Sequence, residues 1–405
     1  MIELPDVQAE ILAAVSPLEP TSVPLGDALG LATARELVAA EPVPPFANTA
    51  MDGYALRAGD TVGARASTPV RLAVVGELPA GRSPEGMVVG EGEAIRIMTG
   101  APVPDGADAI VMVELTERDG DGVRVLHEAA PGDHVRAAGG DLEAGQAMFP
   151  AGTVLTPAHL GVLASLGHRD VPAFPRARVG VLSTGDELVE SGRLTPGQIR
   201  DANRPMLLAL VEATGAEPVD FGIVPDDEAR ITATLEDALA VCDAVITSGG
   251  VSVGDYDYVK AVLDRLGHLS WWQVAIKPAK PLAFGVVAGT PVFGLPGNPV
   301  SSHVSYELFA RPAVLGLMGH PNPFRPEVTA VAEHEMGRKP DGKLHLDRVR
   351  LRYEAGRHLA RRTGVQASNV LSAMAAANGL ALLPDGDGVA EGDEVRVMLL
   401  DAPTN

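Results

Sequence analysis

Between residues 176 and 318, short apolar runs alternate with helical patterns, and this alternation constrains the fold more than any other feature of the chain. Three apolar runs read as buried strands, each followed by a helix-like segment: ARVGVLST, PVDFGIVPD and CDAVITSGG. Two more strand-like runs and a last helix follow: LAFGVVAG, TPVFGLPG and SSHVSYELFARPAVLGLMG. Strands that alternate with helices form a mostly parallel sheet covered on both faces. We therefore predict a doubly wound α/β domain over residues 176–322.

The flanking segments predict three further domains. Residues 3–35 indicate a helix, a turn and a second helix, and 151–167 indicate a helix that begins at Thr156 and Pro157. We assign 1–41 and 143–175 to one discontinuous linking domain of helical or mixed structure. Residues 42–142 contain short strands broken by glycine and proline, which is typical of a β-rich domain. The alternating strands of 323–405 predict a small C-terminal β-barrel, with a sandwich as the alternative.

Charge and cysteine content exclude several classes of protein. The formal net charge of −21 repels nucleic acid and anionic membranes, so neither is expected as a partner. Cys242 is the only cysteine, which excludes an intrachain disulfide and a cysteine metal cluster. The chain has no apolar run of about 18 residues and does not begin like a secretory signal. We expect a cytoplasmic protein.

Three polar, glycine-containing turns follow predicted strands of the α/β domain. They are STGDEL at 183–188, TSGGVSVGDYDYVK at 247–260 and GLPGNPVS at 294–301. Ligands of open parallel sheets bind outside the carboxyl ends of the strands. Glycines let backbone amides approach an anion, whereas nearby carboxylates oppose one unless a metal lies between them. The turns therefore predict a phosphate-bearing ligand held with a divalent cation, although each turn alone is ordinary turn chemistry.

Carboxylates and lysines near this edge fit such a ligand. The carboxylates are Asp186, Glu187, Asp226, Asp227, Asp255 and Asp257. Oxygen ligands suit Mg²⁺, which needs only one or two carboxylates beside a substrate phosphate. Capping of the following helix is an equally good interpretation of Asp226-Asp227. Lys277 and Lys280, in the proline-stiffened segment VAIKPAKPLAFG, are expected to bind an anion.

Other patterns are ambiguous or missing. Nothing local to Asp52 makes it catalytic, and Arg136 and Asp141 lie in a glycine-rich segment without a clear role. The sequence has no paired-histidine zinc motif, no GxxxxGK[ST] phosphate loop, no GxGxxG after a strand and no GxSxG elbow. These absences disfavour zinc enzymes, common nucleotide triphosphatases, NAD enzymes and serine hydrolases.

Taken together, the motifs of the chain resemble those of the bacterial MoeA type of molybdopterin molybdenumtransferase, which is related to the E domain of gephyrin. Nine segments carry the resemblance in family order: PPFANTAMDGYAL, IRIMTGAPVP, VRAAGGDL, FPAGTVLTPAHLGVLASLG, VGVLSTGDELV, GQIRDANRPML, ITSGGVSVGDYDYVK, IKPAKPLAFG and FGLPGNPVSSHVSYELF. The resemblance as a whole runs from about residue 3 to 400. One departure is Ala279, where the family often has glycine, and it puts the local loop geometry in question.

The resemblance implies an enzyme that inserts molybdate into adenylylated molybdopterin, with magnesium, and yields molybdenum cofactor and AMP. It implies a four-domain homodimer, whose cleft lies between the α/β domain of one subunit and the β-rich domain of the other. Partners would be molybdopterin adenylyltransferase and molybdoenzymes or cofactor-handling proteins. A non-catalytic carrier of molybdopterin and the adenylyltransferase itself remain alternatives, although the latter resembles only 176–318.

The family's functional positions carry over to matching residues of this chain. Catalytic roles fall to Asp52, Thr99, Glu187, Asp226 and Asp257, and the last three would also hold magnesium. Ligand-binding roles fall to Ser248, Gly249, Gly250, Ser252, Gly254, Lys277, Lys280, Pro296, Pro299, Arg136, Asp141 and Ser368. The match to a further arginine does not decide between Arg348 and Arg350.

Overall fold

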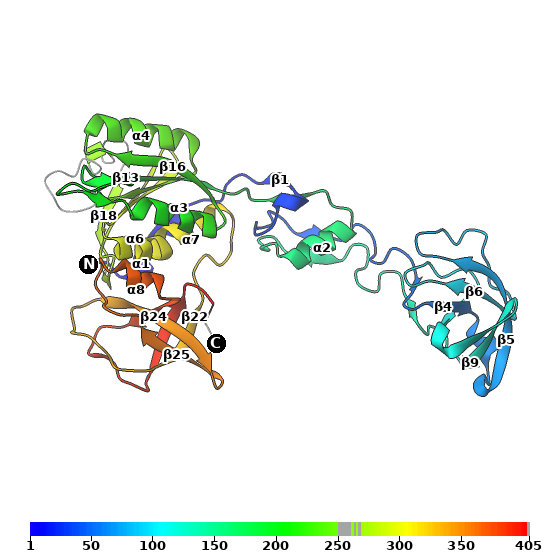
Figure 1. Ribbon diagram of the computed structural model, residues 1–405. Coiled ribbons are helices and arrows are strands. Elements are labelled where there is room, and N and C mark those ends of the chain that lie inside the picture. Colours follow the sequence, from blue (N-terminus) through cyan, green and yellow to red (C-terminus); the bar gives the residue numbers. More distant parts are fainter. Residues whose placement is uncertain (250–260, 263–264, 266–268, 403–405) are drawn as a thin grey trace. The chain divides into compact units, whose positions relative to one another are not determined.

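The computed structural model describes residues 1–249, 261–262, 265 and 269–402 (Figure 1). The chain divides into two compact units. The large unit comprises Met1–Arg35, Gly152–Thr156 and Asp170–Asn405, and the small unit comprises Glu36–Ala151 and Pro157–Arg169. The two segments of the predicted linking domain are divided between these units, and the four domain boundaries remain a prediction.

A six-stranded sheet forms the centre of the α/β part of the large unit. Its order is β16-β13-β17-β21-β20-β18; the first four strands are parallel, and β20 pairs antiparallel with both β21 and β18. The strands are β13 (Arg178–Thr184), β16 (Glu217–Val224), β17 (Ala244–Ser248), β18 (Leu269–Gln273), β20 (Pro281–Val287) and β21 (Thr290–Leu295). Buried runs such as β13, in which six of seven residues are buried, form because both faces of the sheet are covered.

Helices cover the two faces of this sheet, as Figure 1 shows for α3 and α4. On one face, α1, α3, α6 and α7 share a core with Val179, Val181 and Ile246. On the other, α4 packs Ile231 and Leu235 against Leu182 and Val245. The helices are α1 (Leu4–Ala13), α3 (Asn203–Ala213), α4 (Glu228–Val241), α6 (Pro299–Ser305) and α7 (Arg311–Leu317), with a π-helical turn at Tyr306–Ala310. The predicted doubly wound domain is confirmed.

The C-terminal strands close into a barrel. The pairing runs β24-β25-β22-β28-β26 and returns from β26 to β24, so the sheet has no open edge. This closure decides between the predicted barrel and the alternative sandwich in favour of the barrel. The elements are β22 (Glu327–Ala332), β24 (Leu344–Glu354), β25 (Arg357–Arg362), α8 (Leu371–Ala375), β26 (Gly379–Leu383) and β28 (Glu394–Leu399). Leu346, Leu380 and Met398 join the core of the α/β part, so barrel and α/β sheet pack together.

Short elements complete the large unit. They are β1 (Thr21–Pro24), η1 (Leu25–Asp27), β12 (Asp170–Ala173), β14 (Leu188–Val189), β15 (Ile199–Arg200), β19 (Ile276–Lys277), β23 (Met336–Gly337) and β27 (Gly388–Val389). The second helix predicted within 3–35 is wrong. Gly30 has φ of 78°, and the chain beyond it pairs with 153–155 through bonds such as Leu155 N to Leu31 O, at 2.9 Å. Long-range pairing overrides the helical pattern there.

The small unit is built on a six-stranded sheet, as predicted for a β-rich domain. Its order is β7-β4-β6-β5-β9-β8, and cores pack on both faces. The strands are β4 (Gly53–Leu56), β5 (Arg65–Leu78), β6 (Glu93–Ile97), β7 (Ala109–Met112), β8 (Thr116–Asp119) and β9 (Gly122–His127). The remaining elements are β2 (Leu37–Val38), β3 (Asn48–Thr49), η2 (Ala58–Thr61), η3 (Val113–Leu115), β10 (Val135–Arg136), β11 (Ala147–Phe149) and α2 (Pro157–Ser165).

Helix α2 begins at Pro157, as the sequence predicts. In the described part of the chain, no helix has the length and apolar content that a membrane crossing requires.

Candidate functional site

The carboxyl ends of three parallel strands lie side by side in the large unit. Ser183 of β13 is in register with Ser248 of β17, and Ser248 is in register with Leu295 of β21. The three predicted turns follow these positions, so their described parts meet at one edge of the sheet. The predicted ligand-binding residues Ser248 and Pro296 are thereby brought close together, although they lie far apart in the sequence.

Asn203 ties two of these turns together. Its Nδ2 donates to Ser248 Oγ at 2.8 Å and to the Gly297 carbonyl at 2.8 Å. Asp201 fixes the start of α3, because its Oδ1 accepts from the Asn203 amide at 3.0 Å and from Ser183 Oγ at 3.2 Å. Neither Asn203 nor Asp201 is among the residues predicted from the sequence. The sequence pattern that could identify them is a pair of polar residues at the start of a predicted helix, beside the strand ends.

Gly249 occupies a position that excludes larger residues. Its φ is 97°, and a Cβ there would lie 2.9 Å from the Thr184 carbonyl oxygen. Its amide donates to the Leu295 carbonyl at 3.1 Å, which closes the turn against β21. The predicted ligand residues Gly250, Ser252 and Gly254, and the predicted metal ligand Asp257, lie outside the described residues.

The acidic residues divide between capping and a possible metal site. Asp227 caps α4, accepting the Arg230 amide at 2.9 Å, so the capping interpretation holds for this residue. Partial burial, together with the charges of Asp186 and Glu187, raises the pKa of Asp226. Asp186 Oδ1 also accepts the Asp226 amide at 3.1 Å. Carboxylate oxygens are the ligands that Mg²⁺ prefers, and one or two suffice beside a substrate phosphate. Glu187 and Asp226 are the described candidates, and the described residues contain no group of three His, Cys, Asp or Glu placed to hold a metal.

Several basic side chains lie together beside the barrel. A hollow of about 460 Å³, which we call the basic hollow, is lined by Lys277, Pro278, Gly337, Arg338, Lys339, Asp341, His345, Asp347, Arg348, Arg362, Gly364 and Gln366. Lys277 enters it because β19 pairs with β24, in register with His345. Lys280, its predicted companion, is half-buried and is not part of this lining.

Arg348 has the most unusual environment in the hollow. Its side chain is fully buried, and only Nη2 is bonded, to the carbonyls of Val365 at 3.1 Å and Ala367 at 3.0 Å. Nε and Nη1 are buried without a partner among the described residues. Burial accordingly lowers the pKa of Arg348. Arg350 is exposed and is not part of the lining, so of the two candidates Arg348 is the one that borders the hollow.

The loop over Arg348 connects the basic hollow to the strand edge. The loop comprises residues 364–368. The carbonyl of its last residue, Ser368, accepts the Val300 amide at 3.2 Å. Pro299, the first residue of α6, immediately precedes Val300. Ser368, Pro296 and Pro299 therefore lie where the barrel adjoins the third glycine turn.

In the small unit, Asp52 and Thr99 are in direct contact. Asp52 Oδ1 accepts from the Thr99 amide at 2.7 Å and from Thr99 Oγ1 at 2.7 Å. These two hydrogen bonds lower the pKa of Asp52. Oδ2 has no partner among the described residues. Arg136 and Asp141 are both exposed. Arg136 lies on β10, which pairs with β3, and the Asp141 amide donates to the Val43 carbonyl at 2.9 Å. Their predicted roles stay predictions.

Models of three family regions match successive parts of the chain. They are the MoeA N-terminal region (domain I and II) at residues 2–167, the probable molybdopterin binding domain at 180–316, and the MoeA C-terminal region (domain IV) at 334–400. Molybdopterin molybdenumtransferase 2 of Mycobacterium tuberculosis is 42% identical, over 96% of this chain and 97% of its own. Molybdopterin molybdenumtransferase of Haemophilus influenzae is 36% identical, over 98% of each chain. The crystal structure of the MoeA protein of Pyrococcus horikoshii OT3 superposes with a TM-score of 0.82, at 31% identity, over 98% of this chain and 100% of that chain.

Thr99→Val should raise the pKa of Asp52, because it removes the hydroxyl donor and keeps the amide. Asp52 has a depressed pKa in the folded state, so its ionised form persists to lower pH and is lost as pH falls through that value. A pH titration of the Asp52 carboxyl by NMR of aspartate-labelled protein measures the shift. Thr116→Val is the control, since Thr116 bonds Val113 instead. An unchanged Asp52 pKa in Thr99→Val would contradict the assignment.

Ala279→Gly should be nearly neutral for stability. Ala279 is buried and has φ of 72°, so this turn does require the conformation that favours glycine. Glycine relieves about 1–2 kcal/mol of strain. It loses about 0.8 kcal/mol of methyl burial and about 0.5–1 kcal/mol of backbone entropy. The gain and the losses nearly cancel, so the net change is within about 0.8 kcal/mol of zero.

The matched control for Ala279 is Ala275→Gly, at a similarly buried alanine that has no positive φ. Without strain relief, it should cost about 1.5 kcal/mol. Denaturant unfolding of both variants measures the difference. Equal losses at the two positions would show that Ala279 is not strained.

Proposed function

The chain belongs to the MoeA family, and we propose that it is a molybdopterin molybdenumtransferase, which inserts molybdate into adenylylated molybdopterin and releases AMP. The product is molybdenum cofactor. The observation that carries the proposal is the buried, half-unpartnered guanidinium of Arg348 beside a glycine-lined strand edge. A buried cation with free donors is costly unless an anion meets it.

Molybdate would bind in the basic hollow. Arg338 and Arg362 are already paired there, Arg338 with Asp341 at 2.9 Å and Arg362 Nε with Asp347 at 2.7 Å. We expect the Lys277 ammonium and Arg348 Nε and Nη1, which are buried without partners among the described residues, to donate to a tetrahedral dianion. Burial lowers the pKa of His345, which lines the same hollow, so near neutral pH the imidazole adds little charge.

The phosphate groups of the pterin substrate would lie at the strand edge. Gly249 carries no side chain at the end of β17, so a ligand can approach the backbone there. Asn203 fixes Ser248 and Gly297 relative to each other. Lys280 would meet remaining phosphate charge. Glu187 and Asp226, with Asp257, would hold Mg²⁺, which when bound supplies charge neutralisation of the phosphoanhydride.

The two ligand regions adjoin because the 364–368 loop contacts both Arg348 and Val300. The dithiolene sulfurs can therefore face an oxyanion while the phosphates stay on the sheet edge. Sulfur replaces molybdate oxygen, the oxygen leaves as water with the two thiol protons, and hydrolysis of the anhydride releases AMP. Fixed positions of the reactants provide most of the rate enhancement.

Asp52 and Thr99 would complete the site from the small unit. We infer a homodimer in which this pair, with Arg136 and Asp141, faces the strand edge of the other copy. Ionised Asp52 would offer its free Oδ2 to the substrate as an acceptor. A cytoplasmic location, supply by molybdopterin adenylyltransferase and delivery to molybdoenzymes follow from the proposed reaction.

One assay tests the function against its alternatives. The chain is given adenylylated molybdopterin, magnesium and molybdate, and AMP and active cofactor are measured. We expect both products, and Asp52→Ala or Asp257→Ala should abolish AMP release while circular dichroism stays unchanged. Substrate binding without AMP would indicate a carrier, and adenylylation of free molybdopterin with ATP would indicate the adenylyltransferase. Normal turnover of either variant would refute its catalytic assignment.

Arg348→Gln should raise the KM for molybdate by about tenfold or more, because it removes charge-assisted bonds to the oxyanion. Glutamine retains an amide donor for the loop carbonyls. Arg350→Gln, at an exposed position of the same strand, is the control and should leave this KM unchanged. A similar effect of both variants would show that general surface charge, rather than the basic hollow, attracts molybdate.

A further inference from the structure

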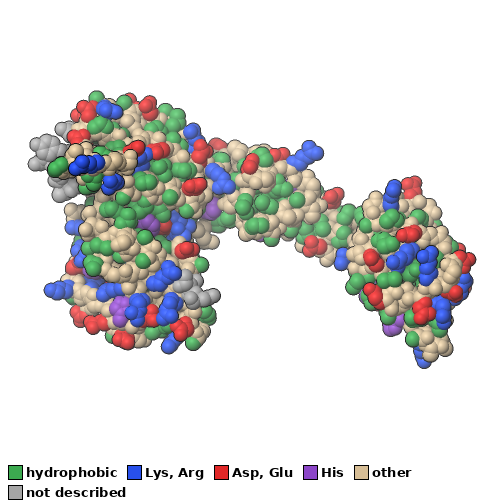
Figure 2. Space-filling view, viewed as in Figure 1, with side chains coloured by type: hydrophobic (Ala, Val, Ile, Leu, Met, Phe, Trp, Pro, Cys, Tyr) green, Lys and Arg blue, Asp and Glu red, His purple; other side chains and the backbone are tan. Residues whose placement is uncertain are grey.

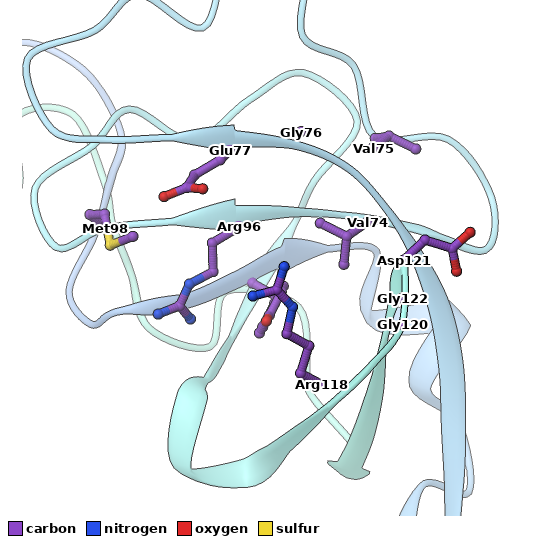
Figure 3. A pocket seen from close by; sticks show the side chains of 11 residues that line it. Val74, Val75, Gly76, Glu77, Arg96, Met98, Arg118, Gly120, Asp121 and Gly122 are labelled. Carbon is purple, nitrogen blue, oxygen red and sulfur yellow. The ribbon is translucent and has the colours of Figure 1, made fainter.

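Two arginines of the small unit enter a hollow for which neither the sequence nor the proposed reaction provides a use. The hollow has a volume of about 570 Å³ and is bordered by β4, β5, β6 and the β8–β9 turn. Arg96 extends into it from β6 and Arg118 from β8 (Figure 3). Arg96 lies over the Tyr54 ring, 5.1 Å from its centroid, and donates only one bond, to the Gly53 carbonyl at 3.3 Å.

Arg118 forms no hydrogen bond or ion pair with any described residue, which sets it apart from its neighbours. In the same sheet, Arg71 bonds Asp119 at 3.1 Å and Asp121 at 2.5 Å, and Arg124 bonds Glu117 at 3.1 Å. Acidic and basic side chains alternate over the visible face of this unit (Figure 2). Although the chain has a net charge of −21, Arg96 and Arg118 have no carboxylate partner among the described residues.

The backbone makes room for a ligand between these arginines. The register of β5 against β6 shifts between Val74 and Gly76, which marks a bulge at the wall of the hollow. Bulges often lie next to binding sites, where they redirect side chains. Gly120 and Gly122 also line the hollow and add no side chains, and Asp121 between them is paired with Arg71. Glu77 is the one nearby acid on β5, and it forms no ion pair with either arginine among the described residues.

The hollow adjoins the Asp52–Thr99 pair. The charge of Arg96 helps to lower the pKa of Asp52, after the two Thr99 hydrogen bonds. Met98, which lines the hollow, directly precedes Thr99. An anion held by Arg96 and Arg118 would therefore be fixed beside the part of the small unit that carries Asp52.

We propose that Arg96 and Arg118 form a binding site for a small tetrahedral oxyanion, either a phosphoryl group or free molybdate, separate from the basic hollow. Stacking on Tyr54 orients the Arg96 guanidinium and leaves its edge available as a fork of donors. Arg118 supplies the second fork. Two such groups match a tetrahedral dianion, which also removes the repulsion between them.

Arginine modification with phenylglyoxal, mapped by mass spectrometry on the full chain, tests the site. Inorganic phosphate and molybdate are added separately, and sodium chloride at equal ionic strength gives the reference. We expect at least one anion to protect both Arg96 and Arg118, and the anion effective at the lower concentration identifies the ligand. Arg124, which is already paired, should show no such protection.

Arg118→Gln should raise the concentration of the effective anion that half-protects Arg96 by about tenfold. Arg124→Gln is the matched control on the same hairpin and should not change it. The proposal is overturned if neither anion protects beyond sodium chloride, if Arg124 is protected equally, or if both variants act alike. Because protection is measured without pterin substrate, a failure here leaves the AMP-release assay unaffected, and the reverse also holds.

Discussion

Parallel pairing of β13, β17 and β21 is the constraint on which the large unit depends. Parallel strands deliver their carboxyl ends to one edge, so Thr184, Ser248 and Leu295 meet there although over 100 residues separate the first from the last. The edge then needs a device that holds its turns in place. Asn203 provides it, with both amide protons used on Ser248 and Gly297. The site is therefore held by a helix start, a rigid element, rather than by the turns alone.

The buried guanidinium of Arg348 adds a second, electrostatic constraint. A fully buried arginine with two unbonded nitrogens lowers the stability of the barrel, and a bound anion would offset this cost. The cost is reduced by the carbonyls of Val365 and Ala367, which hold Nη2. The arrangement resembles a preorganised anion site, since donors fixed before binding lose little entropy when the ligand arrives.

Most of the architecture could be predicted from local patterns, because buried strands, helix starts and glycine turns leave direct marks in the sequence. The α/β domain, the β-rich sheet and the start of α2 at Pro157 follow from such marks. The helix predicted beyond Leu25 failed because pairing with 153–155, distant in sequence, decides that segment. The roles of Asn203 and Arg348 were equally hidden: each depends on which groups surround it in space, and Arg348 and Arg350 look equivalent in a strand pattern.

At Ala279 the chain has alanine where the family often has glycine, and the backbone conformation shows what this difference costs. Glycine would be the natural choice at φ of 72°, yet the alanine methyl is buried and contributes packing that glycine would forgo. Strain and burial thus nearly cancel, which explains how the loop between Lys277 and Lys280 keeps its shape without glycine. The same loop sends Lys277 into the basic hollow through the pairing of β19 with β24. The barrel and the α/β sheet therefore depend on one short segment to place a cation between them.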